Sequence, residues 1–286
     1  MSPPTSSCFD VQITDKVAHI SLSRGKELNT MTPEFWLDLP RIVKDIDRNA
    51  RARAIVLSST GKHFTAGMDL KVFAAHDGPG APGQSSPDPY LRAEKFRLDI
   101  RNIQDSFNCI EEARIPVIAA IQGGCIGGGV DLVSACDFRL ATRDAFFCIQ
   151  EISIGMTADV GTFPRLCRLM PEGWVRQMAY TGERLDAERA RQLGLVNDVF
   201  ETQEAMIAHA LSLARTIASK NPLAVTGSKV MMNYARDHST ADCLDYIGVW
   251  NSAMLAGPHM QEAMRARLEN RDPAFADLLP LRDTPL

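Results

Sequence analysis

The chain has 286 residues with a formal net charge of −4, and 45% of the residues are hydrophobic and 23% charged. This length is sufficient for a large buried core, and the charged fraction of an ordinary globular protein excludes wholesale disorder. The small negative charge argues against nucleic acid as the main partner, because that affinity comes chiefly from neutralising phosphates with basic side chains.

The cysteines and the two chain ends bear on the compartment. The seven cysteines are odd in number and irregularly spaced without a CxxC pair, so we expect reduced thiols rather than a zinc site or a disulfide framework. The first ten residues lack the features of a secretory or transit peptide, and the last three are not a peroxisomal signal. No long uncharged apolar run predicts a membrane span. We therefore expect a cytoplasmic protein that has no membrane partner.

The first third of the chain shows alternating and continuous apolar runs. Residues 9–23 alternate apolar and polar side chains around a polar turn, which predicts a β-hairpin. A helix is expected to begin at Pro33, with Thr32 as its N-cap. The short apolar run 54–57 predicts a buried parallel strand. Residues 76–89 are rich in Gly, Pro, Ser and Asp and predict a loop.

A glycine cluster follows the next buried strand. A helix is expected from Tyr90 to about residue 112, and the apolar run 115–121 then leads straight into residues 123–129, where five of seven residues are glycine. Such glycines allow close approach of a ligand to the backbone and expose N–H groups at a helix N-terminus. Their spacing matches neither nucleotide-binding fingerprint. A tight turn that serves helix–strand packing is the alternative interpretation.

Alternation of strands and helices continues to about residue 200, with short strands at 138–141 and 145–148. The pattern then becomes purely helical, with predicted helices at 202–219, 222–236, 239–256 and 259–271. We therefore predict two parts, an α/β core of residues 1–200 followed by a helical segment of residues 201–286.

Three carboxylates lie in apolar surroundings. Asp131 follows the glycines within an apolar helix start, Glu151 follows a short strand, and Asp159 lies between two apolar stretches. Burial would raise the pKa values of these groups and suit them to proton transfer near neutral pH. Each could instead be a structural carboxylate or a helix cap. The turn at 63–70 could add a backbone N–H to this site, although an ordinary strand-to-helix turn explains it equally well.

The segments HFTAGMDL at 63–70 and GGCIGGGVDL at 123–132 resemble the crotonase superfamily of enoyl-CoA hydratases and isomerases. Within that superfamily, Glu151 and ADVGT at 158–162 are most similar to the dienoyl-CoA isomerase branch. The resemblance implies an α/β crotonase (ClpP-like) fold, a spiral of ββα units with a C-terminal helical trimerisation segment. It also implies a homotrimer or a dimer of trimers, an acyl-CoA thioester as substrate, and no metal or other cofactor beyond the coenzyme A of the substrate.

The resemblance also implies roles for individual residues. The backbone N–H groups of Met68 and Gly128 would form an oxyanion hole for the thioester oxygen. Glu151 would handle the proton at C2 and Asp159 the proton at C6, although the reverse assignment stays open. Asp131 would hold the carboxylates together or tune their pKa values. Together these residues would convert a 3,5-dienoyl-CoA into a 2,4-dienoyl-CoA.

Binding of coenzyme A is expected at a second set of residues. The set comprises a basic residue, the turn before Lys71 and one glycine of the cluster, namely Lys26, Ala66, Gly67, Asp69, Leu70 and Gly127. Arg265, Arg267 and Arg271 are further candidates for a phosphate or adenine contact, but an ordinary solvated helix face explains them better.

Two other functions compete with the isomerase. An enoyl-CoA hydratase would use two glutamates, whereas here only Glu151 fits and Asp131 is one methylene shorter. A non-enzymatic RNA-binding or scaffold member of the same fold is the other alternative. The absence of an excess of basic residues and the complete set of three carboxylates count against it.

Overall fold

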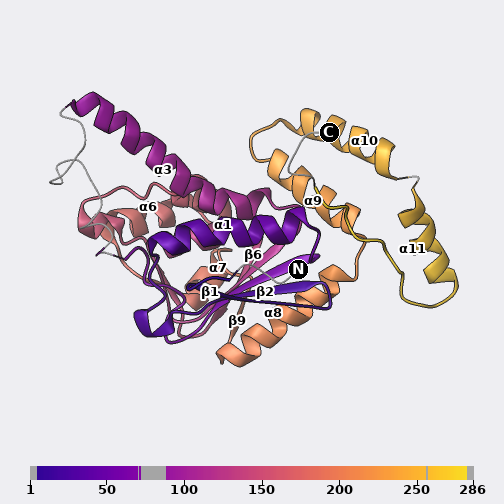
Figure 1. The fold of residues 1–286 in the computed structure, drawn as a ribbon, viewed down its shortest axis with the longest axis horizontal. Coiled ribbons are helices and arrows are strands. Elements are labelled where there is room, and N and C mark those ends of the chain that lie inside the picture. The colour runs from indigo at the N-terminus through magenta and orange to yellow at the C-terminus, as the bar shows by residue number, and fades with distance from the viewer. Residues whose placement is uncertain (1–4, 70, 72–87, 256, 282–286) are drawn as a thin grey trace.

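The computed structural model describes residues 5–69, 71, 88–255 and 257–281. Its centre is a sheet of six strands with one layer of helices on each face (Figure 1). Within the described residues, no helix is both long and apolar enough to cross a membrane.

The main sheet confirms the predicted hairpin and the predicted buried strands. The first two strands form an antiparallel hairpin, and every later pair is parallel. Along the sheet the order is β1 (Phe9–Thr14), β2 (Val17–Leu22), β3 (Ala54–Ser59), β4 (Val117–Ile121), β6 (Phe138–Thr142) and β9 (Asp198–Phe200).

The two faces of the sheet carry separate apolar clusters because side chains of a strand alternate between faces. Ile55 and Leu57 of β3 pack on the side of α1 (Pro33–Arg48) and α3 (Pro89–Glu112). Ala54 and Val56 pack on the side of α8 (Gln203–Ala218). Burial on both faces explains why β3 and β4 appear in the sequence as continuous apolar runs.

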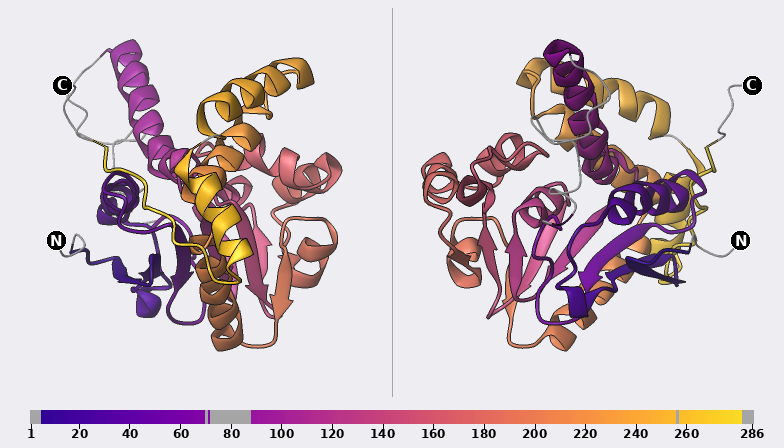
Figure 2. Two further views of the ribbon diagram at one scale, coloured as in Figure 1. Left: turned by 90° about the vertical axis from the view of Figure 1, so that its right-hand side faces the viewer. Right: turned by 60° about the vertical axis from the view of Figure 1, so that its left-hand side comes forward.

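Helix α1 begins at Pro33, as predicted, with Thr32 in the N-cap position. Helix α3 confirms the helix predicted after the Gly- and Pro-rich stretch, most of which lies outside the described residues. Only its C-terminal half is buried, around Phe107 and Ile110. Both views of Figure 2 show the N-terminal half of α3 projecting beyond its neighbours.

A second, smaller sheet contains the strand predicted at 145–148, but the sheet itself was not predicted, because the strand at 115–121 was expected to lead directly into the glycines. Instead β4 ends at Ile121 and Gly123 redirects the chain with a φ of +55°. A Cβ atom on Gly123 would lie 2.1 Å from the carbonyl oxygen of Lys62, so only glycine fits this turn. The second sheet comprises β5 (Gly124–Ile126), β7 (Phe146–Cys148) and β8 (Leu185–Asp186).

Short helices and 3-10 turns lie between the strands and the longer helices. The 3-10 turns are η1 (Gly25–Glu27) and η2 (Glu151–Ile154). The helices are α4 (Gly128–Ser134), α5 (Thr162–Leu169), α6 (Glu172–Thr181) and α7 (Ala187–Gln192).

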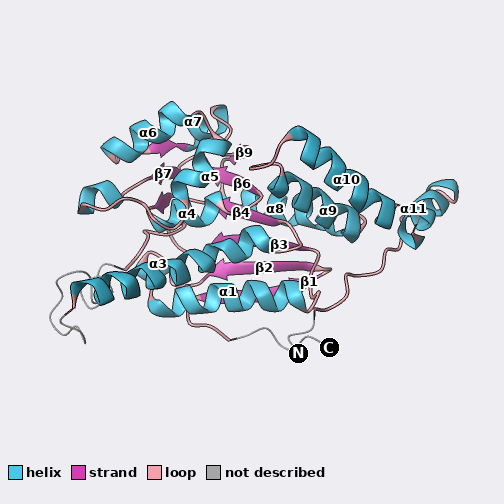
Figure 3. Ribbon diagram, turned by 90° about the horizontal axis from the view of Figure 1, so that it is seen from above, coloured by secondary structure: helices cyan, strands magenta, loops and turns pink. Residues whose placement is uncertain are grey.

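The C-terminal helices follow the predicted pattern. Helices α9 (Pro222–Tyr234), α10 (Thr240–Met254) and α11 (Pro258–Leu268) lie together beyond one end of the sheet (Figures 1 and 3). Helix α8 instead packs on the sheet itself. No residue of α10 is buried. Assembly through this segment, and its separation from residues 1–200 as a unit, remain predictions.

A buried lysine attaches α9 to the core. The Nζ of Lys229 donates to the carbonyl oxygens of Ile110 and Ile115 at 3.0 and 3.1 Å and to the carboxylate of Asp137 at 2.9 Å. The Lys229 side chain is only 4% exposed, so its charge is balanced by these three acceptors rather than by water.

We predict that Lys229→Met lowers the free energy of unfolding by about 3 kcal/mol, because removing one member of a buried pair leaves the other uncompensated. Denaturant unfolding of the full chain measures the effect. The exposed Lys220 provides a matched control in Lys220→Met. Equal unfolding midpoints for the two variants would contradict the anchoring role.

Candidate active site

Two backbone segments meet beside the glycine cluster. Met68 pairs with Met31 as an isolated parallel bridge, in which the N–H of Met31 donates to Gly67 and the N–H of Asp69 donates to Met31. Successive N–H groups of an extended segment point in opposite directions, so the N–H of Met68 points away from Met31. That group is therefore directed to the other side of the segment, as an oxyanion donor requires.

The second predicted donor is the N–H of Gly128. Gly128 is the first residue of α4, where backbone N–H groups have no partner within the helix. Gly67 brings the two segments together, since a Cβ atom there would lie 2.8 Å from the carbonyl oxygen of Ile126 and 3.7 Å from the nitrogen of Gly128. A larger residue than glycine would separate them.

The three predicted carboxylates come from three different elements. Asp131 lies on α4 with only 1% of its surface exposed, and its Oδ1 accepts a hydrogen bond of 2.6 Å from the N–H of Thr162. Glu151 begins η2, and a Cβ atom on Gly127 would lie 3.1 Å from its Oε1. Asp159 lies just before α5, and its carbonyl oxygen accepts from Gln104 of α3 at 2.6 Å.

Burial and mutual repulsion favour the protonated forms of these groups. Burial raises the pKa of Asp131 to about 6, and the charge of Asp159 raises it as well, while the N–H of Thr162 opposes the change. Burial raises the pKa of Glu151 to about 7, with further contributions from Asp131 and Asp159. The pKa of Asp159 is also raised by burial. Near neutral pH such a cluster can both accept and donate protons.

One oxygen of Glu151 is available for a reaction. Its Oε2 is buried and has no hydrogen-bond partner among the described residues. An unpaired buried carboxylate oxygen is costly in a folded protein, which makes it a candidate base for a bound substrate.

The other predicted residues lie around this site to different degrees. Lys26 is exposed on η1, and the same turn contacts the 66–69 segment through the N–H of Ala66, which donates to Leu28 at 3.0 Å. The carboxylate of Asp69 accepts from Thr30 and from the N–H of Lys71. Leu70 lies outside the described residues.

The three arginines near the C-terminus are not brought to the carboxylates within this chain. Arg265 and Arg267 lie on α11, which occupies the end of the molecule away from α4 and α5 (Figure 3). Arg271 is engaged in ion pairs with Glu262 and Glu269. The described residues contain no group of three or more His, Cys, Asp or Glu side chains placed to hold a metal ion. The expectation of no cofactor stays a prediction.

Sequence reasoning missed the residues that support the carboxylates. Gln104 and Thr162 hold the segment around Asp159, and Arg165 joins it to α3. Their partners lie far away in the sequence, so spacing carried no signal for them. Arg165 could have been noticed as a cation on the first turns of a helix close to Asp159.

Comparison with known proteins supports the resemblance. Residues 12–278 match the family described as enoyl-CoA hydratase/isomerase. The mitochondrial Δ3,5-Δ2,4-dienoyl-CoA isomerase of Homo sapiens is 41% identical over 90% of this chain and 77% of its own. The peroxisomal isomerase of that name from Arabidopsis thaliana is 37% identical over 92% and 93%. The crystal structure of an enoyl-CoA hydratase from Bacillus anthracis superposes with a TM-score of 0.84 at 28% identity, covering 94% of this chain and 99% of that one.

These comparisons confirm the predicted α/β fold and correct the predicted compartment. The expectation of a cytoplasmic protein is wrong, because the relatives named Δ3,5-Δ2,4-dienoyl-CoA isomerase are mitochondrial or peroxisomal. The prediction depended on the lack of a recognisable signal at the chain ends.

The raised pKa of Glu151 predicts a pH-dependent stability. A carboxyl with a pKa of about 7 when folded, against the usual 4.5, keeps its proton in the folded state between these pH values, so stability decreases as pH rises through this window. Glu151→Gln should therefore stabilise the protein by on the order of 2 kcal/mol at pH 8, and the gain should vanish near pH 4.5. Thermal unfolding across this range checks it. The exposed Glu27→Gln is the control, and a gain independent of pH would contradict the assignment.

Proposed function

Because the chain belongs to the enoyl-CoA hydratase/isomerase family, we propose that it isomerises 3,5-dienoyl-CoA thioesters to 2,4-dienoyl-CoA thioesters. The observation that carries this proposal is the cluster of three carboxylates, Asp131, Glu151 and Asp159, whose pKa values are raised by burial. Moving a double bond along a chain needs one proton removed and another added at a distant carbon. Two acids in opposite protonation states can perform both transfers.

The N–H groups of Met68 and Gly128 bind the thioester oxygen in this proposal. Removal of a proton from C2 places negative charge on that oxygen, and fixed backbone donors stabilise it without reorganising. One such donor is typically worth about 3 kcal/mol of transition-state stabilisation. The identity of the side chain is irrelevant to a backbone donor, so a methionine serves as well as any other residue at position 68.

The proton transfers are assigned to Glu151 and Asp159. Glu151, through its unpartnered Oε2, takes the proton from C2, and the charge spreads through the diene to C6 and onto the thioester oxygen. The reacting form in this scheme has Glu151 ionised and Asp159 protonated, and Asp159 delivers its proton to C6. Glu151 ends protonated and Asp159 ionised, so one proton must return between them before the next turnover. The charge of Asp131 raises the pKa of Glu151 and makes it a stronger base.

Coenzyme A is proposed to bind along η1 and the 66–69 segment. Lys26 is exposed there and can pair with a phosphate, and the hydrogen bond from Ala66 to Leu28 holds the two segments side by side. Gly67, Asp69 and Gly127 complete the surface that faces the thioester end. The protein supplies all the proton chemistry in this scheme, and coenzyme A enters only as part of the substrate.

An enoyl-CoA hydratase is the second candidate, favoured by the superposition on a solved hydratase. Hydration of a 2,3 double bond uses two carboxylates that hold one water. Asp131 is shorter than a glutamate and its Oδ1 is occupied by the N–H of Thr162. Asp159 would also have no role in hydration. A purified enzyme that hydrates crotonyl-CoA and fails to isomerise 3,5-dienoyl-CoA would establish the hydratase instead. Salt-sensitive RNA binding with no turnover of any acyl-CoA would establish the non-enzymatic alternative.

We predict that Asp159→Asn lowers kcat for dienoyl-CoA isomerisation by at least about 100-fold, because an amide cannot act as the acid at C6. Binding of the thioester should change little, since the amide keeps the size of the side chain and the substitution leaves the backbone N–H groups of Met68 and Gly128 in place. Absorbance of the conjugated product measures kcat, and calorimetry with a non-reactive thioester measures affinity. The exposed Asp198→Asn serves as the control. Isomerisation at the rate of the unaltered enzyme would exclude Asp159 from the reaction.

A further inference from the structure

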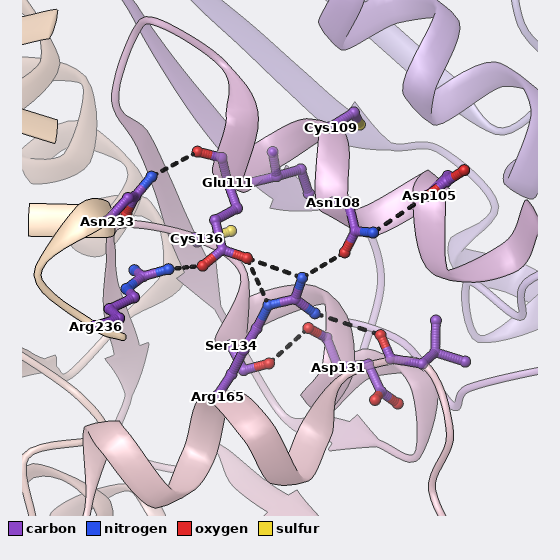
Figure 4. A network of polar contacts seen from close by, with 12 residues as sticks. Asp105, Asn108, Cys109, Glu111, Asp131, Ser134, Cys136, Arg165, Asn233 and Arg236 are labelled. Carbon is purple, nitrogen blue, oxygen red and sulfur yellow. Dashed lines mark hydrogen bonds and ion pairs between the residues drawn. The ribbon is translucent and has the colours of Figure 1, made fainter. Parts of the chain in front are cut away.

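Arg165 connects the carboxylate site to the helices around it. Its guanidinium donates to Oε2 of Glu111 at 3.1 and 3.0 Å and to Oδ1 of Asn108 at 2.7 Å, both on α3 (Figure 4). It also donates to the carbonyl oxygen of Val160, the residue after Asp159, at 3.4 Å. The Arg165 side chain is only 11% exposed, so these acceptors replace most of its water.

The backbone is shaped to admit this side chain. Gly161 has a φ of +127°, which side chains rarely allow, and a Cβ atom there would lie 1.9 Å from Nη1 of Arg165. The next residue, Thr162, donates its N–H to Asp131. Residues 159–162 therefore carry one carboxylate, bind another and receive the guanidinium.

Glu111, which accepts from Arg165, is also bound by residues of the C-terminal helical segment. Arg236, just after the end of α9, forms an ion pair with the other carboxylate oxygen of Glu111. Asn233 of α9 donates to the carbonyl oxygen of Glu111 at 3.0 Å. Figure 4 shows both side chains reaching Glu111 from the side opposite Arg165. The position of Arg165 is thus fixed by α3, α5 and α9 together.

The charged groups around Asp131 differ in sign. Asp159, in the loop before α5, and Arg165, on α5, both act on the pKa of Asp131 through their charges, and the charge of Asp131 acts in turn on Glu151 of η2. The thiol of Cys125 on β5 also lies nearby, and burial raises its pKa so that it stays neutral. The hydrogen bond from Thr162 lowers the pKa of Asp131 most, and the charge of Arg165 lowers it further, against the effects of burial and of Asp159.

We infer that Arg165 is a positioning residue of this site, which fixes the segment carrying Asp159 against α3 and places a positive charge beside Asp131. It does not touch the substrate in this account. The inference rests on the proposed function for its kinetic consequences, whereas its structural part stands on the contacts alone. Two properties of the Arg165 side chain are involved. One is the planar, forked guanidinium that donates to three acceptors, and the other is its positive charge.

Two substitutions distinguish these properties. Arg165→Met removes both, and Arg165→Lys keeps the charge but loses the fork. Both should lower kcat by about 10-fold or more with KM changed by less than about 3-fold, because a small displacement of a reacting group costs rate rather than binding. Arg165→Met alone should move the acid limb of the pH profile upward by about half a pH unit, since the carboxylates then keep their protons to higher pH.

Arg51→Met is the matched control. Arg51 pairs with Asp45 at the end of α1, and the exposed fractions of that pair, 16% and 25%, resemble the 11% and 24% of Arg165 and Glu111. This variant should lose stability without changing kcat or the pH profile. An equal loss of kcat in Arg51→Met, or an Arg165→Met enzyme with unaltered kcat and pH profile, would overturn the inference. Full recovery of kcat in Arg165→Lys would also overturn it, because charge alone would then suffice.

Hydrogen exchange keeps this test separate from that of the reaction. Amides of residues 158–162 should exchange faster in Arg165→Met than in Arg51→Met, whatever the enzyme catalyses. If the unaltered enzyme fails to isomerise dienoyl-CoA, the proposed function fails while this difference still supports the positioning role. Equal exchange in the two variants would refute the role of Arg165 independently of any activity.

Discussion

The withdrawal of three carboxylates from water, one buried and two half-buried, is the constraint on which the rest of this structure depends. Charged groups that leave water are costly, and like charges in one place add to that cost. Three features of the structure offset this cost. A backbone N–H from Thr162 binds Asp131, the guanidinium of Arg165 lies close by, and raised pKa values let part of the cluster keep its protons. The third of these is also what makes the cluster useful for chemistry.

The same close packing brings the backbone segment around Met68 against the start of α4, which carries Asp131. Gly67 lets the 65–69 segment run against the start of α4, and Gly127 adopts a φ of +54° beside Glu151. Neither position tolerates a side chain without moving a group of the site. The glycine cluster is thus required twice, for the turn into the second sheet and for the close approach of the backbone to Glu151. Its two interpretations from sequence, a tight turn and a binding site, are compatible.

The sequence predicted those features that depend on local pattern. Periodicity identified the hairpin, α1 and the parallel strands β3 and β4, and apolar surroundings identified Asp131, Glu151 and Asp159 as candidates. Strand β5 was missed because three residues between glycines have no readable period. The link from Arg165 to Glu111 spans 54 residues and becomes visible only when α3 and α5 pack together. Contacts of this kind depend on tertiary structure, and a single sequence does not record them.

Deuterium incorporation tests the central claim, the division of work between Glu151 and Asp159, most directly. A 3,5-dienoyl-CoA is incubated with enzyme in deuterated water, and the label at C2 and C6 is followed by NMR. The account predicts that Asp159→Asn exchanges the proton at C2 without forming product, because Glu151 still acts as the base. It predicts no exchange at C2 for Glu151→Gln. Exchange at C2 in Glu151→Gln together with none in Asp159→Asn would contradict the assignment.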